Sequence, residues 1–213
     1  MIRHSVRDWI LAACLSAIAG FVDAIAFVQL GGFFVSFMSG NSTRLSVGLV
    51  SAPEQALIAG GLIASFVLGV IVGTLASRAS SAAHAPERVM GVVAILLACA
   101  ALLAHAQMNA AAIALLAIAM GAENAVFQRD GEVSIGVTYM TGTLVKLGQR
   151  LASALTGGPR FDWAPYLILW CGLVVGAICG AIAHAHLALA SIWIAAVAAL
   201  ALALVMRRNA RAP

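Results

Sequence analysis

The stretch Val35-Ser-Phe-Met-Ser-Gly-Asn-Ser-Thr-Arg-Leu45 has a copy in the second half of the chain, Val137-Thr-Tyr-Met-Thr-Gly-Thr-Leu-Val-Lys-Leu147. The Val, Met, Gly and final Leu are identical, and the Ser/Thr, Phe/Tyr and Arg/Lys differences are conservative. Upstream of the two copies, Gly20-Phe-Val-Asp-Ala24 aligns with Gly121-Ala-Glu-Asn-Ala125. Blocks that agree in order at a nearly constant offset indicate an internal repeat. We place the two repeats at about residues 9–107 and 110–206.

Glycines in the second apolar segment of each repeat extend the alignment. Gly69 and Gly73 align with Gly172 and Gly176, and each pair has the small-xxx-small spacing that lets helices approach closely. We expect these glycines to pack helices together, either between the two halves or in a dimer.

Long apolar runs surround the repeated blocks and identify a membrane protein. Of the 213 residues, 63% are hydrophobic and 9% are charged, whereas a soluble domain carries about 25% charged residues. A bilayer is spanned by about 20 apolar residues in a helix. Six runs approach or exceed this length: 9–29, 55–77, 89–107, 110–128, 164–183 and 188–206. The first run follows two arginines, as in a signal peptide, but its counterpart in the second repeat favours a retained span. The whole chain, residues 1–213, is predicted to form one integral membrane domain.

The copied segments, 33–52 and 133–155, are too polar at their centres to form helices that face lipid. Irregular, glycine-centred backbone at membrane depth occurs only where protein or a water-filled cavity surrounds it. If both segments enter and leave on the same side, the chain has six spans, and eleven of its twelve Lys and Arg residues lie on the cytoplasmic side or at its interface, leaving Arg44 outside. Basic residues favour the cytoplasmic side of membrane proteins.

Six spans place three in each half, and an odd number makes the two halves oppositely oriented. The predicted fold is therefore all-α, with about six transmembrane helices and two broken or re-entrant segments in a 3+3 inverted repeat. Interrupted helices at matching positions of an inverted repeat are a pointer to a transport site near the bilayer midplane. The predicted location is a bacterial inner membrane with both termini in the cytoplasm.

Two acids lie within the apolar runs, Asp23 in the first and Glu123 in the fourth. An ionisable residue inside a membrane costs at least about 2.5 kcal/mol and suggests a function. Protonation would neutralise either acid, as a proton-coupled carrier requires. The alternative is structural, with Asp23 paired to Arg44 and Glu123 paired to Lys146.

The polar centres offer a binding site. If helices begin near Ser39 and Thr141, their first amides provide unpaired donors and partial positive charge, which favour an anionic or carboxylate-bearing solute. Alternatively, Ser39, Ser42, Thr141 and Thr143 only cap the helix starts. The residues predicted to line the site are Asp23, Ser39, Gly40, Asn41, Thr43, Arg44, Glu123, Asn124, Thr141, Gly142, Thr143 and Lys146.

Other chemistries have little support in the sequence. The net charge of +4 comes from basic residues at span ends, so we expect no nucleic acid partner. The four cysteines lie in apolar spans without a C-x-x-C motif, so we interpret them as small packing residues. We find no metalloprotease, nucleophile-elbow or nucleotide-binding motif, and we predict neither a metal nor another cofactor nor an enzyme.

The repeated blocks resemble the signatures of the YoaK-type bacterial membrane proteins. Residues 20–24 and 31–43 are similar to "G-Y-V-D-A … G-G-x-F-V-x-x-M-T-G-N-T", and residues 120–125 with 138–144 are similar to "G-x-Q-N-A … T-T-Y-V-T-G-T". Here Glu123 stands where the signature has Gln, so its acidity is a departure from the family pattern. The resemblance implies a bacterial inner-membrane protein of about six spans in a family of unknown function.

Together these features predict a small secondary transporter or permease, with the substrate site at the broken segments and Asp23 as the coupling or gating acid. Six spans make a small carrier, so the expected partners are the lipid bilayer, a small solute and a second copy in a homodimer. The alternative is a membrane scaffold, sensor or accessory subunit that transports nothing. A carrier requires a solvent-reachable cavity where the segments meet, whereas a dry, tightly packed interface there favours the scaffold.

Overall fold

The computed structural model describes residues 5–81, 84–129, 132–133 and 135–210. These residues are almost entirely helical, as expected. The helices are α1 (Val6–Gln29), α2 (Met38–Ser51), α3 (Pro53–Arg78), α4 (Ala85–His105), α5 (Asn109–Glu123), α6 (Met140–Leu155), α7 (Ala164–Leu187) and α8 (Ile192–Ala210). One 3-10 turn, η1 (Ala188–Ser191), joins α7 to α8. A short antiparallel hairpin of β1 (Gln128–Arg129) and β2 (Glu132–Val133) departs from the all-helical expectation.

Local signals in the sequence account for the helix starts. Ser5 and Asp8 form a reciprocal capping box at the start of α1. Pro53, Pro86 and Pro165 occupy the first turns of α3, α4 and α7, where a missing amide hydrogen costs nothing.

Four described helical stretches are long and apolar enough to cross a membrane. They are α1, α3, α4 and a 47-residue stretch, 164–210, that contains α7, η1 and α8. The apolar run predicted at 110–128 is shorter as a helix, because α5 ends at Glu123. Fifteen residues span about 22 Å, less than the hydrocarbon core of a bilayer. Large apolar side chains remain exposed on the outer faces, for example Val50 at 90% and Leu57 at 78%, which suits contact with lipid.

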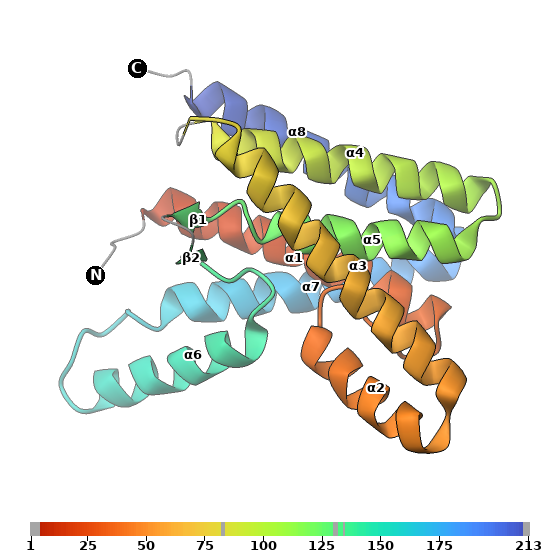
Figure 1. The fold of residues 1–213 in the computed structure, drawn as a ribbon. Helices are drawn as coiled ribbons and strands as arrows, with labels where there is room; N and C mark the ends of the chain where they lie inside the picture. Colours follow the sequence, from red (N-terminus) through yellow and green to blue (C-terminus); the bar gives the residue numbers. More distant parts are fainter. Residues whose placement is uncertain (1–4, 82–83, 130–131, 134, 211–213) are drawn as a thin grey trace.

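The helix ends gather at two opposite ends of the molecule (Figure 1). Both termini, the α3–α4 turn, the hairpin and the α6–α7 loop lie at the left end in this view. The α2–α3, α4–α5 and α7–α8 turns lie at the right end. The chain returns from the right end to the middle before α2 begins, and α2 then runs back to the right. The chain likewise returns from the left end to the middle before α6, which runs back to the left.

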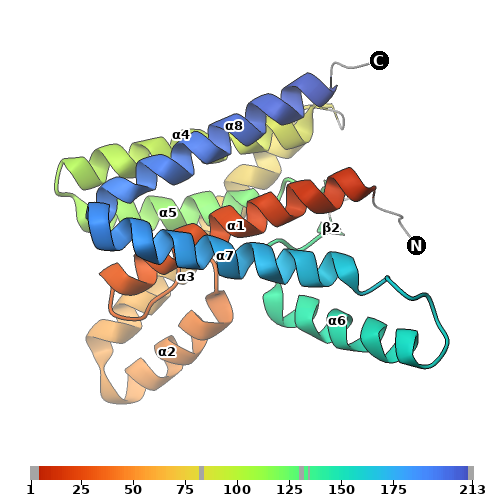
Figure 2. The same cartoon turned by 180° about the vertical axis from the view of Figure 1, so that it is seen from behind.

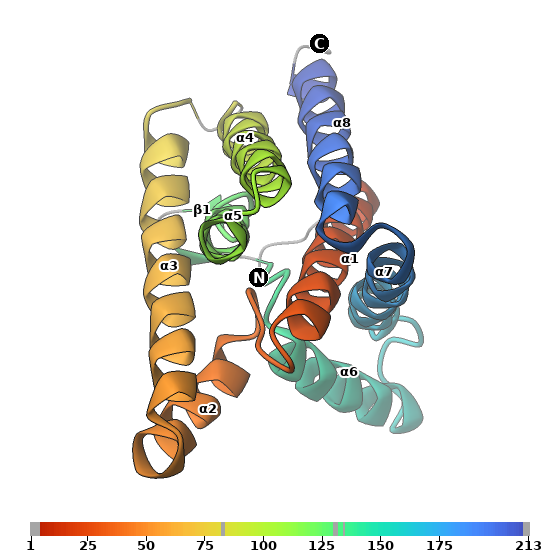
Figure 3. The same cartoon turned by 90° about the vertical axis from the view of Figure 1, so that its right-hand side faces the viewer.

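The core forms where α5 packs against α3, α4 and α1, and where α4 packs against α8. The view from behind shows α1 and α7 lying side by side (Figure 2). Viewed from the end, α2 and α3 lie on one side of the molecule and α1, α7 and α8 on the other, with α4 and α5 between them (Figure 3).

Two helix pairs, α1 with α7 and α5 with α3, make the same glycine contacts. In each case a Cβ atom on the glycine would collide with the backbone of the facing helix. In the first pair the contacts are Gly20 with the Leu173 carbonyl, Gly176 with that of Ala17 and Gly180 with that of Phe21. In the second pair they are Gly121 with the Phe66 carbonyl, Gly69 with that of Ile118 and Gly73 with that of Ala122. The packing role expected of these glycines is confirmed.

These contacts correct the glycine alignment by one helical turn. Gly69 and Gly73 correspond in space to Gly176 and Gly180, not to Gly172 and Gly176. The sequence could not choose between the two registers because Gly172, Gly176 and Gly180 repeat every four residues.

The four cysteines, interpreted from the sequence as small packing residues, are free and exposed: Cys14, Cys99, Cys171 and Cys179. Cys14 and Cys179 line a cavity between α1, α7 and α8.

Candidate functional site

Asp23 fixes the extended segment that leads into α2. Its carboxylate accepts hydrogen bonds from the Val35 amide at 2.8 Å, the Ser36 amide at 2.7 Å and the Ser36 hydroxyl at 2.5 Å. Asp23 and Ser36 are both buried. A carboxylate with three donors is well satisfied, because each donor offsets part of the cost of removing it from water.

Asn41 holds the same segment from the other side. Its Oδ1 accepts from the Phe34 amide at 3.1 Å, and its Nδ2 donates to the Phe34 carbonyl at 2.6 Å. The Asn41 side chain is fully buried, and it satisfies both backbone groups of a residue that has left helical structure.

Asn124 takes the place of Asp23 in the second half. Its Oδ1 accepts from the Thr138 hydroxyl at 2.9 Å, and its Nδ2 donates to the Met120 carbonyl at 3.0 Å. The aligned pairs Asp23–Ser36 and Asn124–Thr138 therefore join the same elements in each half. Ser16 of α1 also donates to the Val137 carbonyl at 2.9 Å, which ties the second segment to the first half of the chain.

The helices that follow begin at Met38 and Met140, within one residue of the predicted starts. Neither start has a side-chain cap hydrogen bond, so the proposed capping by Ser39, Ser42, Thr141 and Thr143 is wrong. The Ser42 and Thr43 hydroxyls instead donate to carbonyls one turn back in α2. The first amide of α2, that of Met38, donates to the Ser36 carbonyl at 3.1 Å, and no side-chain cap is present at the start of either helix.

A cavity of about 290 Å³ lies where the two helix starts meet. We call it the central cavity. Its lining combines hydroxyls with aromatic and methionine side chains: Ser36, Phe37, Met38, Ser39, Phe66, Thr138, Tyr139, Met140, Thr141 and Gly142. Both halves thus contribute matching residues. Of the predicted site residues, the structure brings Ser39, Thr141 and Gly142 to this cavity.

A larger, more apolar cavity of about 610 Å³, the lateral cavity, runs between α1 and α7. Asp23 lines it, and Ser36, Phe37, Thr138 and Met140 line both cavities. The shared residues make the lateral cavity a neighbour of the central one.

The remaining predicted site residues lie outside the central cavity. Gly40 packs against the Phe37 ring, and Thr143 is buried in α6. Arg44 stacks on the Phe33 ring, with 4.9 Å from Cζ to the ring centroid, and Lys146 is exposed on α6.

The proposed ion pairs do not form. In the part of the chain that the structure describes, neither Asp23 nor Glu123 is bridged to Arg44 or Lys146. Burial by the surrounding helices keeps both acids away from the two basic side chains.

Sequence reasoning missed Ser36, Thr138 and the ring of Phe66. The sequence held a signal for Ser36 and Thr138, because a hydroxyl residue follows the Val that both copies of the repeat share. It held no signal for Phe66, because only the helix crossing of α3 and α5 brings this ring to the cavity.

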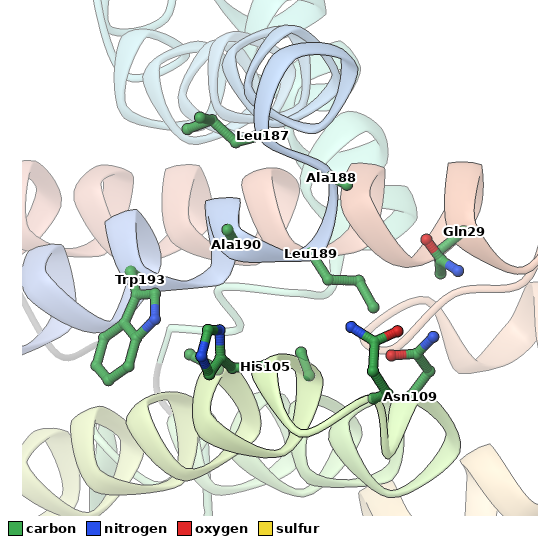
Figure 4. A pocket seen from close by; sticks show the side chains of 11 residues that line it. Gln29, His105, Asn109, Leu187, Ala188, Leu189, Ala190 and Trp193 are labelled. Atoms are coloured by element: carbon green, nitrogen blue, oxygen red, sulfur yellow. The ribbon is translucent and has the colours of Figure 1, made fainter.

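A third cavity, of about 390 Å³, lies at the right end of the molecule in Figure 1, under the α4–α5 and α7–α8 turns. Gln29, His105, Asn109 and Trp193 contribute polar or aromatic side chains to it (Figure 4). Gln107 and Ala188, which also line it, are the described non-glycine residues with positive φ, at 62° and 47°.

The family described as "Protein of unknown function (DUF1275)" matches residues 11–205. The chain is 38% identical over 201 residues to the UPF0700 transmembrane protein RA0705 of Rhizobium meliloti (strain 1021), covering 94% of this chain and 86% of the relative. It is 28% identical over 153 residues to the UPF0700 transmembrane protein YoaK of Bacillus subtilis (strain 168), covering 68% of each. No solved structure matches.

The family match covers nearly all of the described helices, and the repeated blocks already resembled the signatures of the YoaK-type proteins. The chain belongs to the DUF1275 family, the transmembrane protein family that includes YoaK.

Proposed function

We propose that this protein is a small secondary transporter whose substrate site is the central cavity. The observation that carries the proposal is the meeting of two uncapped helix starts, one from each half, at a single cavity of about 290 Å³. Half-helix N-termini that face a cavity at the interface of two repeats form the substrate sites of many carriers.

The proposed topology has six spans, with α2 and α6 as re-entrant helices that return to the side from which the chain entered. The return of the chain to the middle before α2 and before α6 supports this arrangement (Figure 1). The end that carries both termini also carries the basic ends of several helices, including Arg78 of α3 and Arg207 and Arg208 of α8. We therefore assign that end to the cytoplasm and the protein to the inner membrane of a bacterium.

The proposed substrate is a small anion. The starts of α2 and α6 supply partial positive charge and lack side-chain caps, and the hydroxyls of Ser39 and Thr141, which line the cavity, add donors. Arg44 and Lys146 do not line the cavity, so the preference rests on the helix ends and not on a basic side chain.

A scaffold or accessory role is the alternative, favoured by the aromatic and methionine side chains in the cavity lining. Such a protein would need no solute, and its cavity could be filled without consequence for its stability or assembly.

The test is to fill the cavity. A Cβ atom on Gly142 meets nothing within 4 Å, and the same is true of Gly148 farther along α6, which does not line the cavity. Gly142→Leu should abolish uptake by proteoliposomes, whereas Gly148→Leu should leave it intact. The assay compares small organic acids and inorganic anions with neutral polyols of similar size. Absence of uptake of every compound by the wild type, or equal uptake by both variants, would contradict the proposal.

A further inference from the structure

Glu123 lies at the last residue of α5, and its side chain is completely buried. Neither Oε1 nor Oε2 has a hydrogen-bond partner among the described residues. Asp23, the other buried acid, has three donors. The two carboxyl groups therefore differ in kind: Asp23 is satisfied as an anion, and Glu123 is not.

Packing does not require a carboxyl group at this position. The alignment of Gly20-Phe-Val-Asp-Ala24 with Gly121-Ala-Glu-Asn-Ala125 places Val22 opposite Glu123. Val22 is fully buried in α1 as Glu123 is in α5. An apolar side chain therefore fills the equivalent position in the other half.

Among the described residues, none forms a hydrogen bond or an ion pair with the Glu123 carboxyl group. Asp23 is a second buried acid, so an anionic Asp23 would repel a negative charge on Glu123. Besides Asp23, the charged or titratable side chains on the helices packed against α5 are Arg7, Asp8, Cys14, Glu54, Arg78, Glu87, Arg88, Cys99 and His105.

We propose that Glu123 holds a proton in the closed arrangement described here and exchanges it with water when the helices around it separate. In the open arrangement the O–H bond breaks, the proton passes to water, and the carboxylate is left hydrated; closing reverses the step. Glu123 thereby couples the conformational cycle to a proton, a role for which Asp23 is unsuited because its donors hold it in place. The coupling rests on the proposed transport function, whereas the bound proton does not.

Infrared spectroscopy of the protein in lipid vesicles tests the bound proton without a substrate. The wild type at neutral pH should show the carbonyl stretching band of a protonated carboxylic acid, and the band should shift after transfer to D₂O. Glu123→Gln should lack this band, and it should fold because an amide has the shape of a protonated carboxyl group and carries no charge. Glu123→Val, which restores the residue of the other half, is the second variant. Absence of the band from the wild type, its persistence in both variants, or a band that never shifts in D₂O overturns the proposal.

Uptake assays then test the coupling separately. For one proton per cycle, the accumulation ratio of the solute should change about tenfold for each unit of imposed pH difference in the wild type. Glu123→Gln should still exchange solute but show no dependence on the pH difference. Unchanged dependence in the variant overturns the coupling. A protonated Glu123 in a protein that moves no solute would leave the proton site in place and contradict the transport function instead.

Discussion

Single atoms decide how closely the two halves of this molecule approach each other. Gly69 of α3 has no Cβ, and an added one would collide with the backbone of Ile118 in α5. Backbone cannot move aside as a flexible side chain can, so the crossing of the two helices depends on this position.

Gly69→Ala should therefore destabilise the protein by about 1 to 3 kcal/mol through overpacking. Gly61→Ala is the matched control, because it lies in the same helix and its added Cβ meets nothing within 4 Å. Thermal unfolding in detergent should show a lower midpoint for Gly69→Ala only. Equal midpoints for the two variants would mean that α3 and α5 do not pack as described.

At the residue scale, the sequence predicted the importance of several buried polar groups but not their partners. A pair with Arg44 was the structural alternative considered for Asp23, yet Asp23 binds the backbone of Val35 and the amide and hydroxyl of Ser36. A repeat alignment identifies which residues matter. It does not identify their partners, because a carboxylate is satisfied equally well by a guanidinium group or by local amides.

At the scale of elements, the backbone is irregular immediately before α2 and α6. The starts of these two helices were predictable to within one residue, because a polar, glycine-centred block interrupts each apolar run. The end of α5 was not predictable, because apolar residues continue beyond Glu123 in the sequence. The helix stops where the Asn124 side chain turns to the Met120 carbonyl and to Thr138, a contact that only the fold brings about.

The re-entrant course of α2 can be tested with cysteines at its flanks, after the four native cysteines are replaced by alanine. Gln29→Cys and Glu54→Cys should react with an impermeant thiol reagent from the same side of the membrane. Ser81→Cys, beyond α3, should react from the opposite side. Labelling of positions 29 and 54 from opposite sides would show that α2 crosses, and the proposed six-span topology would be wrong.

At the scale of the whole molecule, the proposed transport would require the two halves to move relative to each other about the central cavity. A homodimer, formed through the exposed apolar faces of the chain, stays a prediction.

Ser39 of α2 and Thr141 of α6 line the central cavity from opposite halves. Joining these two positions should therefore stop the cycle. The double variant Ser39→Cys/Thr141→Cys, treated with a short, reducible bifunctional thiol reagent, should lose uptake and regain it on reduction. The two single variants, treated alike, control for blocking of the cavity by the reagent itself. Continued uptake by the cross-linked protein would mean that the two helix starts need not separate.

The pairing of α1 with α7 also constrains how the protein is made. Gly20 of α1 packs against α7, which begins at Ala164 and ends at Leu187. Ribosomes add about 5 to 20 residues per second, so α1 enters the membrane roughly ten to thirty seconds before its partner is complete. During that time its close-packing face has no native neighbour. Lipid tails cover this apolar face in the meantime, so the contact between α1 and α7 forms late, by displacement of lipid.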